Sequence, residues 1–141
     1  MTENEIGDML VEAAIGIHRA VGPGLLESVY EILLVHELRK RDLRADRQVS
    51  IPIEYGGHKF DEGFRADILI EEQVIVELKC VERLSKAHWK QLLTYLRLTK
   101  LRVGYLLNFS EALMTKGIIR IANQLPEELA NNHPAVQRSD R

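Results

Sequence analysis

The chain has 141 residues, of which 45% are hydrophobic and 28% are charged, and its formal net charge is −2. This size and balance predict one soluble globular domain, and they exclude an intrinsically disordered chain. The longest uninterrupted apolar run, Ile32 to Val35, is far shorter than the roughly 20 residues of a membrane-spanning helix, so we expect no membrane association.

The N-terminus and the cysteine content indicate a reduced, cytoplasmic protein. The first residues include Glu3 and Glu5, whereas a secretory signal peptide would begin with basic residues. The single cysteine, Cys80, excludes an internal disulfide and a multi-cysteine zinc site. The five histidines share no ligand-like spacing, which argues against a zinc centre of another kind.

Two helices are predicted at the start of the chain. Apolar residues recur at spacings of three and four over residues 3–21, and Gly22-Pro23-Gly24 then ends this helix. A second helix is predicted from about residue 25 to residue 41, because apolar side chains again form a stripe along one face.

The hydrophobic period then changes to two, which predicts a meander of strands. Pro52 indicates that the first of them lies at the edge of the sheet, because proline cannot donate to a ladder. The predicted strands cover residues 49–55, 58–60, 64–70 and 74–80, with a turn at Gly56-Gly57, an acidic bend before residue 64 and a loop at residues 71–73.

The remaining elements predict the fold class. A mixed central sheet, built from an antiparallel meander and one or two further strands and flanked by helices, places the chain in the α/β class. We expect a single domain over residues 1–125 and a polar, flexible C-terminal tail over residues 126–141. The later elements are a helix over residues 84–99, a buried strand over 102–109, a short helical turn over 110–114 and a last strand over 117–122.

The pairing of the two central strands carries the most specific prediction. An antiparallel hairpin around residues 71–73 places Asp67 opposite Glu77 and Arg65 opposite Lys79. A slip of one residue would bring charges into the core, so the hydrophobic pattern selects this register. The register also gives one apolar face, made of Phe64, Ala66, Ile68, Ile70, Val74, Val76, Leu78 and Cys80.

Two carboxylates directly opposite each other predict a cation site. Opposed residues have Cβ atoms about 4.5–5.5 Å apart, so Asp67 and Glu77 repel each other unless a cation lies between them. Hard oxygen ligands favour Mg²⁺ or Mn²⁺. The alternative is an exposed ladder of salt bridges formed by these acids with Arg65 and Lys79, and spacing alone does not decide between the two interpretations.

Charge is distributed unevenly along the chain. Residues 1–37 carry seven acidic side chains and one basic, whereas residues 79–102 carry seven basic and one acidic. This asymmetry is compatible with a positive face that binds phosphates and also with ordinary solvated helix faces.

Four motifs resemble the PD-(D/E)XK nuclease superfamily. Asp67, followed by Glu77-Leu78-Lys79, is similar to its D…(D/E)xK core. Residues 24–30 match GxxExxY, the signature of the GxxExxY family within that superfamily, and residues 91–95 match the QxxxY motif of its RecB-like branches. The resemblance covers about residues 5–125, with Ala66 in place of the usual proline. It implies a restriction-endonuclease-like core.

The resemblance also implies a metal site and a set of catalytic residues. Lys79 would position and polarise the attacking water, and Gln91 would face the same phosphate or metal-bound water. Glu27 would complete the metal site directly or through water. The implied metal ligands are Asp67, Glu77, Glu27 and the backbone carbonyl of Leu78, and the implied catalytic set is Asp67, Glu77, Lys79, Glu27 and Gln91.

The activity that the resemblance implies is hydrolysis of phosphodiester bonds, most simply in DNA, with Mg²⁺ or Mn²⁺ as cofactor. The alternative is a non-catalytic nucleic-acid-binding or partner-binding module that retains the nuclease fold. We expect DNA as the partner, and either a homodimer or a larger DNA-processing complex is compatible with the sequence. The residues expected to contact nucleic acid are Tyr95, Tyr30, Arg65, Arg83, Lys86 and Lys90, although both tyrosines are also ordinary candidates for the core.

Overall fold

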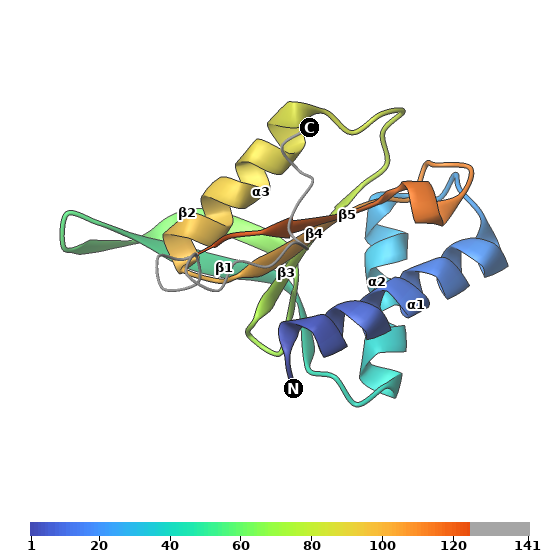
Figure 1. Ribbon diagram of the computed structural model, residues 1–141, viewed down its shortest axis with the longest axis horizontal. Helices are drawn as coiled ribbons and strands as arrows, with labels where there is room; N and C mark the ends of the chain where they lie inside the picture. The colour runs from blue at the N-terminus through green and yellow to red at the C-terminus, as the bar shows by residue number, and fades with distance from the viewer. Residues whose placement is uncertain (125–141) are drawn as a thin grey trace.

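A five-stranded mixed sheet lies between two layers of helices in the computed structural model, which describes residues 1–124 (Figure 1). Helices α1 and α2 cover one face of the sheet, and α3 covers the other. This arrangement confirms the predicted α/β class and the restriction-endonuclease-like core. The helices are α1 (Glu3–Val21), α2 (Glu27–Lys40) and α3 (Lys86–Thr99), with a short 3-10 helix, η1 (Met114–Lys116).

The strands follow one another across the sheet in chain order. The order is β1-β2-β3-β4-β5, and every neighbouring pair is antiparallel except β3 and β4. The parallel pair is joined by α3, as a crossover connection requires. The strands are β1 (Ala45–Tyr55), β2 (His58–Ile70), β3 (Val74–Lys79), β4 (Val103–Asn108) and β5 (Ile118–Ala122).

Two apolar cores hold the helices against the sheet. The larger core packs α1 and α2 on one face, around Leu34, Ile68 and Phe109. The smaller core packs α3 on the other face, where Leu92 and Leu96 contact the strands. Burial on both faces explains why β4, whose six residues are all buried, reads as an almost continuous apolar run in the sequence.

The helix boundaries follow local signals. Thr2 caps α1 in a reciprocal capping box with Glu5, and Gly22, at φ 74°, ends this helix as predicted. Helix α2 begins at Glu27, two residues after the predicted start, because Leu26 still has an extended backbone. Its C-terminal end at Lys40 agrees with the prediction within one residue.

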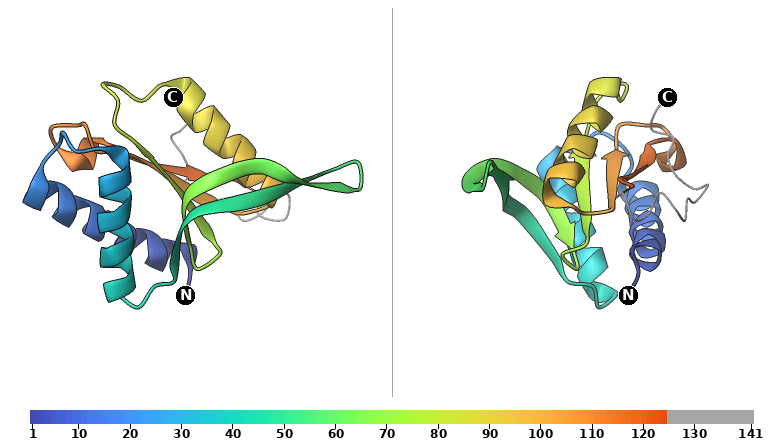
Figure 2. Two further views of the ribbon diagram at one scale, coloured as in Figure 1. Left: turned by 180° about the vertical axis from the view of Figure 1, so that it is seen from behind. Right: turned by 60° about the vertical axis from the view of Figure 1, so that its left-hand side comes forward.

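The first two strands are longer than their hydrophobic alternation predicted. Strand β1 begins at Ala45 instead of residue 49, and β2 runs without a break through the predicted acidic bend. The two strands pair with each other over most of their length, and at the acidic segment the register shifts, with Pro52 alone opposite residues 61–63. The distal part of this hairpin extends beyond the helices (Figure 2), and β1 is an edge strand, as Pro52 predicted.

The hairpin formed by β2 and β3 has the predicted register, but only over part of its length. Ile70 pairs with Val74 and Ile68 with Val76, and the regular ladder then ends. The prediction of one continuous apolar face was wrong. Ala66 and Phe64 pack in the core on the α3 side, whereas Ile68 packs on the opposite side. The strand therefore exchanges its faces around Asp67.

Among residues 1–124, no helix is long and apolar enough to cross a membrane. The predicted tail, residues 126–141, lies outside the described residues, so its flexibility and the domain boundary at residue 125 stay predictions.

Candidate active site

Asp67 and Glu77 lie together where β2 and β3 part. The Leu78 N–H donates a hydrogen bond of 2.8 Å to Asp67 Oδ2, and the Asp67 N–H donates one of 3.2 Å to Glu77 Oε2. Each carboxylate therefore occupies a place that a backbone carbonyl would hold in a regular ladder. The sheet brings the two acids together, as the register predicted, through side-chain insertion between the strands.

Burial makes this pair electrostatically unfavourable without a cation. Glu77 is 9% exposed. Burial, and then the charge of Asp67, raises the pKa of Glu77 from its usual 4.5 to about 8. The pKa of Asp67 is also raised, chiefly by burial, and the Leu78 N–H opposes that shift. A hydrogen bond to the anion stabilises it, but here it does not offset the loss of water.

Lys79 ends β3 beside this pair. Its positive charge lowers the pKa of both Asp67 and Glu77, so the ammonium group lies within electrostatic range of both carboxylates. Its backbone is held in the sheet by pairing with Asn108 on β4. Arg65, predicted opposite Lys79, is exposed and donates a 3.3 Å hydrogen bond to the Gln48 carbonyl instead.

Glu27 lies at the edge of this group. It is the first residue of α2, it is exposed, and its Oε2 accepts a 3.1 Å hydrogen bond from the Cys80 N–H. This contact joins α2 to the chain directly after Lys79. The structure therefore brings Glu27 to the end of β3, one residue beyond Lys79. The hydrogen bond that the structure gives Glu27 is to Cys80 and not to Asp67 or Glu77.

Glu31 is the acidic residue of α2 whose charge affects the carboxylate pair, and none of the sequence motifs includes it. It is 5% exposed, and its charge raises the pKa of both Asp67 and Glu77. Arg47 Nε donates to its Oε2 at 2.8 Å, and Gln48 Nε2 donates to its Oε1 at 2.9 Å. A helical spacing of four from Glu27 was the only sequence signal that could have indicated it.

Tyr95 on α3 borders the site from the opposite direction. Its ring stacks on Phe64, with the ring centroids 3.7 Å apart, and burial together with the charge of Glu77 raises its pKa. Gln91 lies one helical turn earlier and is exposed. The two residues therefore share a helix face, as predicted. Of the two, Tyr95 is the one whose pKa is raised by the charge of Glu77.

Tyr30 lies in the core, where it cannot touch a nucleic acid. It is fully buried, it stacks on Phe109 with centroids 4.3 Å apart, and its hydroxyl donates to the Gly22 carbonyl. The same hydroxyl accepts a 3.1 Å hydrogen bond from the Leu25 N–H. The expectation of a nucleic-acid contact was wrong for this residue, because its bonding capacity is used to hold the turn before α2.

Three of the predicted basic contacts lie just before α3 or in its first turns. All three are exposed: Arg83 is on the connection from β3, and Lys86 and Lys90 are in the first five residues of α3. The described chain therefore presents cations on the same side of the sheet as Tyr95. This placement is compatible with a phosphate-binding surface next to the acids.

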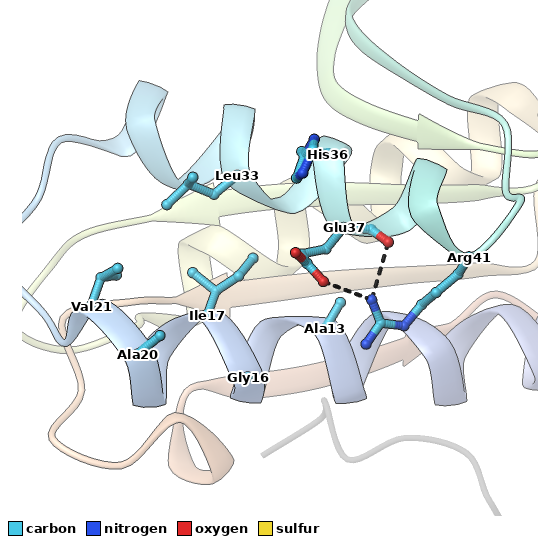
Figure 3. A pocket seen from close by; sticks show the side chains of 9 residues that line it. All are labelled: Ala13, Gly16, Ile17, Ala20, Val21, Leu33, His36, Glu37 and Arg41. Atoms are coloured by element: carbon cyan, nitrogen blue, oxygen red, sulfur yellow. Dashed lines mark hydrogen bonds and ion pairs between the residues drawn. The ribbon is translucent and has the colours of Figure 1, made fainter.

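A cavity of about 310 Å³ between α1 and α2 lies apart from this site (Figure 3). Its lining is mainly apolar, and Arg41 closes one end by binding the Glu37 carboxylate and carbonyl. None of the predicted site residues lines it. The cavity is therefore separate from the candidate site.

The comparisons with known proteins agree with this geometry. The family model of the PD-(D/E)XK nuclease superfamily matches residues 4–121. The chain therefore belongs to this superfamily, whose members are generally nucleases and typically use divalent metal ions.

No curated protein matches the chain. Among solved structures, the chain is similar to the one described as "Crystal structure of SSO0001", with a TM-score of 0.53 and 17% sequence identity. The match covers 88% of this chain and 68% of that one. At this identity the similarity shows the shared fold.

Proposed function

We propose that the protein is a metal-dependent nuclease that hydrolyses phosphodiester bonds in DNA, and that it belongs to the GxxExxY family of its superfamily. The observation that carries the proposal is the hydrogen-bonded placement of half-buried Asp67 next to buried Glu77, with Lys79 beside them. Packing alone does not require three ionisable groups there, because burying two carboxylates without a cation costs free energy.

The donor set fits a hard divalent ion. Asp67 and Glu77 would hold Mg²⁺ or Mn²⁺ with the Leu78 carbonyl, and Glu27 would contribute through water. Among residues 1–124 no three His, Cys, Asp or Glu side chains are grouped for a metal, so two carboxylates and a backbone oxygen are the ligands to test. A bound ion would supply Lewis-acid chemistry and lower the pKa of water.

The chain's own residues would position the substrate. The Lys79 ammonium group would hold the attacking water next to a phosphate and offset the charge that develops on the phosphorus oxygens. Gln91 would donate its amide hydrogens to the same phosphate. Tyr95, fixed by Phe64, would support the DNA strand on the α3 side.

The DNA backbone would follow the exposed basic residues. Arg83, Lys86, Lys90 and Arg65 would neutralise phosphates, so binding should weaken as salt rises. We propose a cytoplasmic protein that acts as a homodimer or within a larger DNA-processing complex. No separate recognition domain accompanies the fold in residues 1–124, so this part of the chain would recognise DNA structure more than sequence.

The experiment that tests this proposal is cleavage of plasmid, single-stranded and branched DNA with Mg²⁺ or Mn²⁺. The matched variants are Asp67→Asn and Lys79→Met, which keep the shape of each side chain. We expect cleavage by the wild type and a loss of at least about 100-fold in both variants, since even outer partners of a metal ligand contribute about 10–100-fold.

Equal activity in the wild type and both variants would reject the mechanism. Salt-dependent DNA binding without cleavage in any metal would instead support the alternative, a non-catalytic module of a larger assembly.

A further inference from the structure

We propose that Gln48 is a positioning residue that holds Asp67 ready for its ligand, and that Glu31 fastens Gln48 to helix α2. This inference rests on the proposed function, because it assigns residues that prepare the same site. No motif in the sequence contains either residue. The geometry that points to them is the interruption of the β1–β2 hairpin next to Asp67.

The interruption is confined to one pair. Strands β1 and β2 keep one register on both sides of it, since Arg47 pairs with Ile68 and Val49 with Ala66. The intervening Gln48 and Asp67 are not paired in the ladder. Gln48 has φ 50°, in the left-handed region that a residue with a Cβ adopts only at a cost in free energy.

The side chain of Gln48 gives a reason for this conformation. Its Nε2 donates to Asp67 Oδ1 at 3.3 Å and to Glu31 Oε1 at 2.9 Å. A primary amide has two N–H groups, so it can serve both carboxylates at once. Arg47 Nε occupies the other oxygen of Glu31 at 2.8 Å. Two consecutive residues of β1 therefore bind the same buried carboxylate.

This arrangement fixes the orientation of Asp67. Its Oδ2 accepts from the Leu78 N–H and its Oδ1 accepts from Gln48, so each oxygen has a donor before any ligand binds. The Gln48 amide is uncharged, so it orients the carboxylate and leaves its negative charge for a cation. An Arg or Lys at this position would neutralise the acid and compete with the metal.

The test removes the amide without adding strain. Gln48→Gly keeps the left-handed backbone accessible and deletes both hydrogen bonds. Gln73→Gly, in the loop between β2 and β3, is the matched control because it removes the same side chain away from Asp67. Mn²⁺ binding by calorimetry, the kcat and KM of DNA cleavage, and hydrogen exchange of backbone amides in the metal-free protein are measured for each.

We expect Gln48→Gly to weaken Mn²⁺ binding by about 10–100-fold and to lower kcat by a similar factor with little change in KM. In the metal-free protein, the Leu78 amide should exchange at least about tenfold faster, because its acceptor is the Asp67 carboxylate, while other β3 amides keep their rates. The Gln73→Gly control should match the wild type. Gln48→Asn, which tolerates the same backbone but is one carbon shorter, should recover little of the loss.

Unchanged Mn²⁺ affinity and unchanged Leu78 exchange in Gln48→Gly would overturn the inference and leave the nuclease proposal intact. Faster exchange throughout β2 and β3 would also overturn it, because the residue would then only maintain the fold. Conversely, a wild type that neither binds Mn²⁺ nor cuts DNA would contradict the proposed function. The exchange rate of the Leu78 amide in Gln48→Gly would still show whether Gln48 holds Asp67.

Discussion

The two sides of the candidate site are built differently. On the side of α2 and the β1–β2 hairpin, Asp67 and Glu31 receive donors on both carboxylate oxygens, and Glu77 is buried between the strands. On the α3 side, Tyr95 is fixed by its stack on Phe64, whereas Gln91 is exposed. Under the proposed function, this difference would serve two tasks, because a metal requires pre-oriented ligands and a long polyanion requires an open, solvated surface.

The strongest way to test this comparison is to remove one acid from the side of α2 and the β1–β2 hairpin. Glu77→Gln should lower DNA cleavage by more than about 100-fold and abolish Mn²⁺ binding, because it removes a charge that no neighbour replaces. Gln91→Ala, on the α3 side, should lower the rate of DNA cleavage by about tenfold or less. Initial cleavage rates and calorimetry measure both, and similar losses in the two variants would contradict the division of tasks.

Buried Glu77 should also make the stability of the metal-free protein depend on pH in an unusual way. The folded state keeps the Glu77 proton up to about pH 8, whereas the unfolded chain releases it near 4.5. The folded state therefore binds more protons, and the free energy of unfolding should fall by up to about 1.4 kcal/mol per pH unit as pH rises between these values.

Urea unfolding across this pH range measures the effect. Glu77→Gln should flatten the profile, since glutamine does not titrate, and it should be more stable than the wild type above pH 8. A wild-type stability that rises between pH 5 and 8 would show that Glu77 is ionised in the folded state.

The turn before α2 also belongs to the first side, because it determines the position of the helix that carries Glu27 and Glu31. Tyr30→Phe removes a hydroxyl that serves Gly22 and Leu25, and it should lower the free energy of unfolding by about 1–3 kcal/mol. Tyr55→Phe, on the projecting hairpin and 76% exposed, should change it by less than about 0.5 kcal/mol. Equal values would mean that the buried hydroxyl contributes nothing.

The smallest effect is expected from the exposed basic residues on the α3 side. Lys86→Glu and Lys90→Glu should each weaken DNA binding modestly and reduce the slope of log affinity against log salt by about 1. Lys116→Glu, on η1 next to α1, is the matched control and should leave the slope unchanged. Fluorescence anisotropy from low to high salt measures this, and an equal reduction by the control would indicate only an effect of net charge.

Much of the fold could be predicted because its signals are local. The period of three to four marks α1, and the glycine after Val21 ends it. The three-residue loop and the alternation around it determine the pairing of Ile68 with Val76, and this pairing brings Asp67 and Glu77 together. An apolar pattern of period two is enough for such a hairpin, since each face must meet a different environment.

Other parts of the site arise from contacts between distant segments. Gln48 contacts Asp67 across 19 positions of the chain and Glu31 across 17, and neither spacing is periodic. The exchange of faces at Asp67 left Ala66 in the opposite core from the one that alternation predicted.

The sequence by itself therefore determined the order of elements, the register of β2 and β3 next to their loop, and the closeness of Asp67 and Glu77. Only the tertiary structure decided that Glu31 acts on this pair, that Glu27 contacts Cys80 and that Tyr30 is buried. The physical reason is range. Periodicity reports which face of an element is apolar, whereas the donor that a buried carboxylate receives depends on which distant segment packs beside it.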